Sequence, residues 1–98
     1  MSRKYFKKFA IMLPNKNVEE IQKSFLDNRK IFENANINLD LDIVQFIQFG
    51  EEKVYGIEGV IFEDTFNESR AKYTLLKKSL KFIFGDIREK MTMQGYRD

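Results

Sequence analysis

The sequence predicts an α+β fold in which two helices pack on one face of a three-stranded sheet. Three segments alternate apolar and polar residues, two others repeat apolar residues at helical spacing, and an N-cap signal precedes each of those two. The segments follow one another in the order β-α-β-β-α. Hairpin pairing and a right-handed crossover favour the strand order 1-3-2, a ferredoxin-like arrangement whose last strand is missing or short. A 3-2-1 or 1-2-3 order is the alternative.

The first strand and the first helix are expected within residues 5–35. Apolar side chains alternate over residues 5–13 until Pro14, which cannot continue a strand ladder. Asn17 is a good N-cap, and Glu20 stands three residues later as in a capping box, so a helix is expected from Asn17 to Ala35. The apolar positions of this helix recur at helical spacing: Val18, Ile21, Phe25 and Phe32.

A hairpin is expected in the middle of the chain. From Ile37 to Ile43 the apolar period is two, as in a half-buried strand, and residues 50–52 resemble a hairpin turn. The return strand is expected from Lys53 to Phe62 and contains Gly56 and Gly59. Glycine inside a strand often marks a bulge or the close approach of another backbone.

The longest periodic segment follows the hairpin. Thr65 and Glu68 have the spacing of a capping box, so a second helix is expected from about Phe66 to about Met91. Gly85 weakens its last turns, and residues 92–98 are expected to form a flexible tail or a short edge strand. The predicted buried stripe of this helix is Tyr73, Leu76, Leu80, Ile83, Ile87 and Met91.

Length and composition point to one small domain covering residues 1–98. Hydrophobic residues make up 43% of the chain and charged residues 33%, which argues against both a disordered segment and a membrane protein. The basic N-terminal segment is followed by no long apolar stretch, so no secretion signal is expected. A chain without cysteine also fits a cytoplasmic location.

The residue types required by most active sites are missing. The chain has no histidine and no cysteine, which removes the commonest general base, the thiol nucleophile and the commonest metal ligands. Asp40 and Asp42 lie in an alternating run and not in a calcium-binding loop, and Gly56 and Gly59 lie inside a strand, where they cannot cradle a phosphate at a helix N-terminus. We therefore predict no catalytic, cofactor-binding or metal-binding residue and expect a protein that is not an enzyme.

Strand parity divides the predicted sheet into a face against the helices and an open face. The helix-facing set is Phe9, Ile11, Leu13, Leu39, Leu41, Ile43, Ile47, Tyr55, Ile57 and Ile61. The open face carries Lys8, Asp42, Gln48 and Glu58 around an apolar island of Ala10, Met12, Val44, Phe46, Val60 and Phe62. Such an island usually marks a protein contact, and a face-to-face homodimer is its simplest occupant. The alternative is that a register shift, a bulge or the C-terminal segment covers it.

The last helix carries two further rows of residues. Leu75, Phe82 and Met93 fall on a second apolar line, which is either a contact surface or a set of scattered exposed residues. A basic row flanks the core stripe and is either a phosphate-binding ridge or an ordinary solvated face. The members of this row are Arg70, Lys77, Lys81 and Arg88.

These observations favour a non-enzymatic protein–protein interaction module that binds itself or another protein. We expect an accessory, regulatory or inhibitory role, in a bacterium or one of its mobile elements, with no cofactor and no membrane partner. The alternative is a nucleic-acid-binding protein that uses the basic row. The net charge of only +2, and the absence of the K/R-G-F/Y pattern of RNA-recognition strands, make nucleic acid the less favoured partner.

Overall fold

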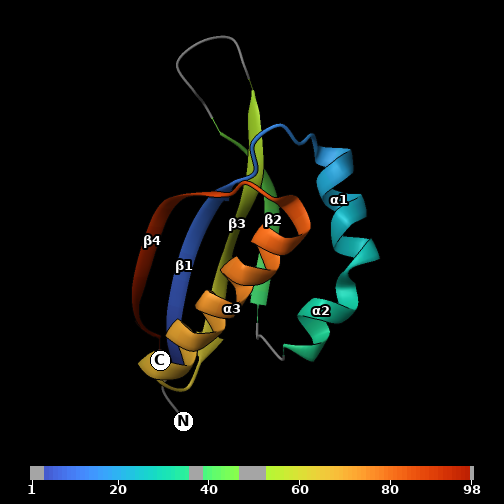
Figure 1. Cartoon of the computed structure of the whole chain (residues 1–98). Helices are drawn as coiled ribbons and strands as arrows, with labels where there is room; N and C mark the ends of the chain where they lie inside the picture. Colours follow the sequence, from blue (N-terminus) through green and yellow to red (C-terminus); the bar gives the residue numbers. More distant parts are fainter. Residues whose placement is uncertain (1–3, 36–38, 47–52, 98) are drawn as a thin grey trace.

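The computed structural model describes residues 4–35, 39–46 and 53–97, and for Leu39 and Arg97 it describes the backbone only. Over these residues the chain forms two layers, an antiparallel sheet and a set of helices on one of its faces (Figure 1). The strands are β1 (Lys4–Met12), β2 (Leu39–Phe46), β3 (Val54–Glu63) and β4 (Arg88–Arg97). The helices are α1 (Val18–Asp27), α2 (Arg29–Asn34) and α3 (Phe66–Phe84).

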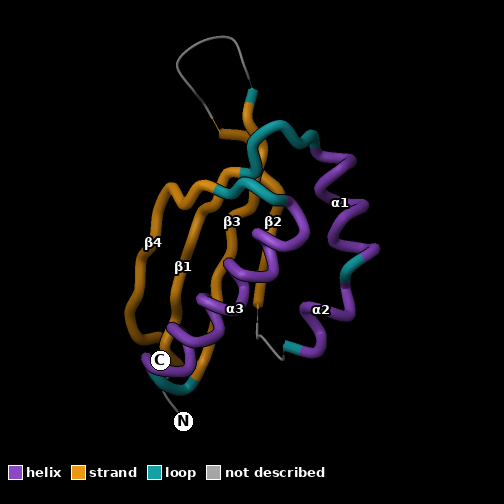
Figure 2. The backbone as a smooth tube through the Cα atoms, viewed as in Figure 1, coloured by secondary structure: helices purple, strands orange, loops and turns teal. Residues whose placement is uncertain are grey.

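The sheet has the strand order β2-β3-β1-β4, with every neighbouring pair antiparallel (Figure 2). β3 lies between β1 and β2, as the predicted 1-3-2 order requires. The prediction of three strands is wrong, because β4 pairs with the other side of β1. The order of elements is therefore β-α-β-β-α-β, the complete ferredoxin-like arrangement, with the first helical segment divided in two.

The last helix ends at Phe84 and not near Met91. Gly85 follows with a φ of 81°, and its N–H donates to the Lys81 carbonyl at 2.9 Å, so the chain leaves the helix through a backbone conformation that favours glycine. Ile87 consequently packs on the core from the loop, and Met91 belongs to β4. Residues 92–98 were predicted to form a flexible tail or a short edge strand; the strand is present, as a continuation of β4 as far as Arg97, and Asp98 lies outside the described residues.

The helix predicted from Asn17 to Ala35 is interrupted at Asn28. Its predicted capping box is present, since the Asn17 side chain accepts from the Glu20 N–H and the Glu20 carboxylate accepts from the Asn17 N–H. Asn28 departs from helical geometry, with φ −115° and ψ 17°, and its side-chain amide donates to the Ser24 carbonyl beside its own backbone N–H, so α1 ends here and α2 begins. At the far end of α2, Lys72 of α3 donates to the Ala35 carbonyl at 2.8 Å and ties the two helices together.

The core lies between the sheet and the helices, and most of the predicted helix-facing side chains are in it. Leu41, Ile43 and Tyr55 pack at its margin, while the side chain of Leu39 and all of Ile47 lie outside the described residues. The buried cluster is Phe9, Ile11, Leu13, Ile21, Ile57, Ile61, Tyr73, Leu76, Leu80 and Phe84. Burial of each large apolar side chain in such a cluster stabilises the fold by about 1.5–3 kcal/mol.

Two glycines allow neighbouring strands to approach β3 closely, as the sequence suggested. A Cβ atom on Gly56 would collide with the backbone oxygen of Ile11 and lie 2.7 Å from the Phe46 ring. A Cβ atom on Gly59 would lie 2.6 Å from the Asp40 carbonyl oxygen and 2.8 Å from the Phe9 ring. Each glycine therefore leaves room for an aromatic ring, on opposite faces of the sheet.

We expect Gly56→Ala to lower the free energy of unfolding by about 1–3 kcal/mol, because the added methyl group meets backbone that cannot rotate away. Urea denaturation of the two proteins measures the difference. Gly95→Ala is the matched control, since its Cβ would meet only the Phe6 ring, at 3.2 Å. Equal stability of Gly56→Ala and the parent chain would contradict the close approach.

We expect Ser69→Ala to raise the free energy of unfolding by about 1 kcal/mol. Ser69 is completely buried in α3, and its hydroxyl has no hydrogen-bond partner among the described residues. Alanine removes this unpaired group and has the higher helix propensity. Thermal denaturation tests the effect, and a lower melting temperature for the variant would show that the hydroxyl is satisfied in solution.

Candidate functional site

The open face of the sheet is the side that no described helix covers. Residues directly opposite one another on paired strands share a face, so the residues paired with Lys8, Ala10 and Met12 point away from the core. Residues paired across the four strands form rows on this face, which we call rungs and give in the order β2, β3, β1, β4. They are Val44, Gly56, Met12 and Arg88; then Asp42, Glu58, Ala10 and Met91; then Asp40, Val60, Lys8 and Met93. Phe62, Phe6 and Gly95 form the next rung, and Phe46 and Val54 pair at the other end.

The apolar residues of this face differ in how accessible they are. Met12 is only 2% exposed although none of the described helices lies above it, and the Phe46 ring lies over Gly56 beside it. Val44, Phe46, Val60 and Phe62 are half-buried, and Met93 is 53% exposed. Most of the predicted interface residues of the sheet are therefore packed against their neighbours, and Met93 on the edge strand is the accessible one.

Two members of this surface, Phe6 and Met91, were not predicted from the sequence. Met91 was predicted to lie in the helix. The apolar-polar-apolar alternation of Met91, Thr92 and Met93 is typical of a strand and could have predicted β4 from the sequence. Phe6 shares the parity of Lys8 and Ala10 and packs beside Gly95 of β4. Met91 joins the open face only because β4 is present, whereas Phe6 lies there already through its pairing with Phe62 of β3.

Charged groups on the open face are segregated by strand. Asp40 and Asp42 lie on β2 and Glu58 on β3, whereas Lys8 lies on β1 and Arg88 on β4. Within the described part of the chain, Arg88 approaches Asp86 at 3.9 Å, and the other four groups form no ion pair. The face thus has an acidic half and a basic half.

The second apolar line predicted on the last helix is only partly present. Leu75 is 39% exposed and Phe82 is 81% exposed on α3, so both are accessible. Met93 is not on their line, because the helix has already ended and this residue lies on the open face of the sheet. The structure therefore presents two separate apolar surfaces, one on each side of the molecule.

The predicted basic row also loses its last member. Arg70, Lys77 and Lys81 lie on α3, but Arg88 lies on β4 and pairs with Met12 on the opposite side of the sheet. Lys77 contacts the Glu89 carboxylate at 3.5 Å. A continuous four-residue ridge along one helix does not exist, and one of the three remaining cations already has an acidic partner.

Tyr73 joins α3 to the sheet beneath this row. The ammonium groups of Lys7 and Lys77 lie 4.6 and 4.8 Å from the centre of its ring. Burial raises the pKa of the Tyr73 hydroxyl well above its usual range, and the nearby Glu89 carboxylate adds to the rise. The tyrosine therefore stays neutral at physiological pH and acts as a packing residue.

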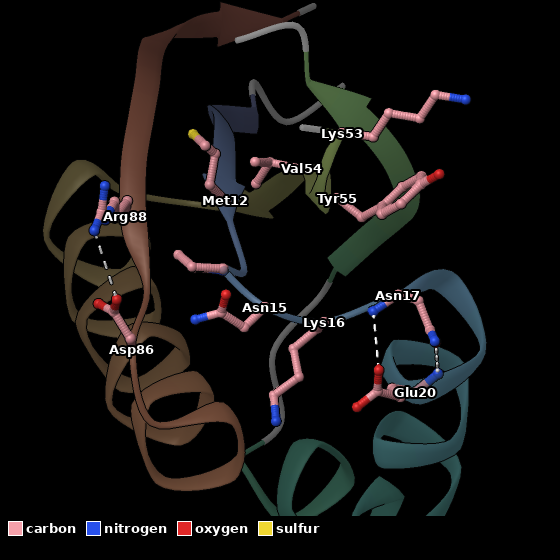
Figure 3. Close-up of a pocket in the computed structure, with 11 residues that line it drawn as sticks. Met12, Asn15, Lys16, Asn17, Glu20, Lys53, Val54, Tyr55, Asp86 and Arg88 are labelled. Carbon is pink, nitrogen blue, oxygen red and sulfur yellow. Dashed lines mark hydrogen bonds and ion pairs between the residues drawn. The ribbon is translucent and has the colours of Figure 1, made fainter. Parts of the chain in front are cut away.

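A polar pocket of about 530 Å³ lies at the end of the sheet where β1 leaves for α1 (Figure 3). Its two carboxylates are already engaged, Glu20 in the capping box and Asp86 beside Arg88. Figure 3 shows these two pairs on different sides of the pocket, with Lys53 extending away from the other lining residues. The charged groups do not converge on one point, so the pocket lacks the arrangement expected of a specific ligand site.

An apolar cavity of about 450 Å³ lies between α1 and β2. It is lined by Gln22, Phe25, Leu26, Leu41 and Ile43. The amide of Gln22 is its one polar side-chain group, so the cavity offers little to orient a ligand.

Over residues 4–35, 39–46 and 53–97, no group of three or more acidic side chains is arranged to hold a metal ion. None of the helices in these ranges has the length and apolar character needed to cross a membrane.

The fold and the open face define a small ferredoxin-like α+β protein. No protein-family model matches the chain, and no curated protein matches it either. Among solved structures, a de novo designed protein called Foldit4 aligns with a TM-score of 0.62 at 7% identity, covering 97% of this chain and 99% of that one. At this identity the likeness shows the fold alone.

Two natural structures align less well. The extracellular region of zebrafish Gpr126/Adgrg6 gives a TM-score of 0.47 at 10% identity, and the alignment covers this whole chain but only 14% of that one. A dimeric ferredoxin-like protein of unknown function from Bacteroides fragilis gives a TM-score of 0.34 at 11% identity, covering 100% of this chain and 97% of that one. At these scores neither alignment bears on function.

Proposed function

We propose that this chain is a non-enzymatic interaction module that self-associates by stacking the open sheet face of one copy on that of another. The observation that carries the proposal is the one-sided cover of the sheet, because the helices bury one face and leave the other to the surroundings. An antiparallel sheet with a solvated outer face normally shows polar residues there. This face instead presents Phe6, Val60, Met91 and Met93.

The size of the open face suits a stable protein contact. Four strands about 4.8 Å apart and about 30 Å long present roughly 600 Å² of flat area, and side-chain relief adds to it. Standard interfaces bury about 800 Å² of accessible surface per partner. A face-to-face stack of two such sheets, about 10 Å apart, would therefore reach the usual range.

The helix side of the molecule remains available in such an assembly. Leu75 and Phe82 of α3 lie on the side opposite the open face and would stay accessible after two sheets stack. An accessory or inhibitory protein that dimerises needs a further surface for its target. We propose that the sheet makes the dimer and the outer side of α3 contacts a protein target, in the cytoplasm.

We expect Met93→Glu to weaken self-association at least tenfold, because it replaces an exposed apolar side chain of the open face with a charge that the interface would have to desolvate. Light scattering behind a sizing column, over a range of protein concentrations, measures the mass of each species. The parent chain should show the mass of a dimer where the variant shows that of a monomer.

Phe82→Glu is the matched control, since it introduces the same charge at an exposed apolar residue of α3. We expect it to leave the dimer intact. A monomeric parent chain at every concentration would contradict the proposal, and dissociation by Phe82→Glu but not by Met93→Glu would move the interface to α3. Circular dichroism of both variants tests whether they are folded.

A further inference from the structure

We infer that the second copy binds about a two-fold axis parallel to the strands, so that the acidic half of each open face lies over the basic half of the other. This inference rests on the proposed self-association and adds the geometry and the pairing residues. The partner is a second copy of this chain because the face is complementary to itself in charge.

The main support for this inference is the separation of acidic and basic side chains across the sheet. The carboxylates of Asp40, Asp42 and Glu58 occupy β2 and β3, and the cations of Lys8 and Arg88 occupy β1 and β4. Among the described residues, Lys8 and the three carboxylates have no ion-pair partner within the chain. These charges are therefore available to a partner that brings the opposite sign to each half.

Two orientations stack a sheet face on itself with two-fold symmetry and keep the strands of the two copies aligned. An axis parallel to the strands, centred between β3 and β1, lays β2 over the partner's β4 and β3 over the partner's β1. An axis perpendicular to the strands lays each strand over its own copy. In the second orientation the six carboxylates of the two copies would gather along the β2–β3 side of the interface, and like charges so placed repel strongly once water is excluded.

The register gives the contacts of the favoured orientation. The partner's Lys8 would lie over Val60, one rung from Glu58 and one strand from Asp40. The partner's Arg88 would lie over Val44, one rung from Asp42. Lysine and arginine side chains are both long enough to reach a carboxylate one rung away, so both cations can meet acidic groups.

The apolar residues also match in this orientation. Phe62 of one copy would lie over the partner's Phe6, and Gly56 over the partner's Met12, each contact occurring twice by symmetry. The aromatic contact sits at one end of the face, and the Phe46 rings close the other. Charges would then occupy the middle rungs, where they set the orientation of the two copies.

The test uses two charge-reversal variants, Lys8→Glu and Glu58→Lys, alone and mixed. Each variant alone places like charges in apposition, and we expect its dimer to be at least tenfold weaker than that of the parent chain. In an equimolar mixture each reversed residue meets a complementary partner, so a heterodimer should form where neither variant forms a homodimer. Native mass spectrometry, with one variant isotope-labelled, identifies the heterodimer.

Matched controls carry the same charge changes on the helix side. Lys81 on α3 and Glu33 on α2 are both exposed, and we expect Lys81→Glu and Glu33→Lys to dimerise like the parent chain. The double variant K8E/E58K keeps the parent's net charge and should regain the homodimer. It provides a second reading if either single variant folds poorly.

The possible outcomes distinguish failure of the parallel axis from failure of the proposed self-association. A heterodimer from the mixture supports the parallel axis. Weakened single variants without recovery on mixing would overturn the axis and leave self-association through this face in place. Single variants that dimerise like the parent chain would overturn the charge pairing, and a parent chain that is monomeric throughout would overturn both.

Discussion

The pairing of β1 with strands on both sides is the constraint on which the rest of this structure depends. β1 is antiparallel to β3 on one edge and to β4 on the other, and its odd-numbered residues Phe9 and Ile11 lie at the centre of the core. Its even-numbered residues consequently form the middle of the open face. A shift of β1 by one residue would exchange the two sets and expose the core.

Glycines help to hold this register. Gly56 faces Met12 and Gly59 faces Phe9, and at each position a side chain would meet backbone of a neighbouring strand. The space that the two glycines leave is occupied by the rings of Phe46 and Phe9, one on each face. Gly56 and Gly59 thus determine how closely the strands approach, and they leave space for one ring in the core and one on the open face.

Much of the architecture was predictable from local pattern. The strand periodicity, the capping residues Asn17 and Thr65, and the close approach at Gly56 and Gly59 each report a short-range physical preference, and the structure confirms them. The end of the last helix was not predicted, because Ile87 and Met91 continue its apolar spacing by coincidence. Gly85 was the local evidence against that continuation, and its positive φ shows why.

The candidate site was harder to predict than the fold, because it depends on long-range pairing. Parity placed Val44, Phe46, Val60 and Phe62 on one face, and the register agrees. That Lys8 stands beside Met93 and Arg88 beside Met12 follows only from the pairing of β1 with β4, which are about eighty residues apart in the chain. The division of the face into acidic and basic halves could not be read before those partners were known.

The irregularity in β4 has a consequence for how far any assembly of this protein can grow. Between Met91 and Glu89 the register against β1 shifts, so Lys90 is an extra residue in the edge strand. The bulge and Lys90 disfavour the pairing of another strand with this edge of the sheet. The charged side chains of Asp40 and Asp42 on β2 disfavour such pairing at the opposite edge. Sheets of this kind cannot readily extend side by side into a fibre, and the proposed stacking would occupy the whole open face in a single closed pair.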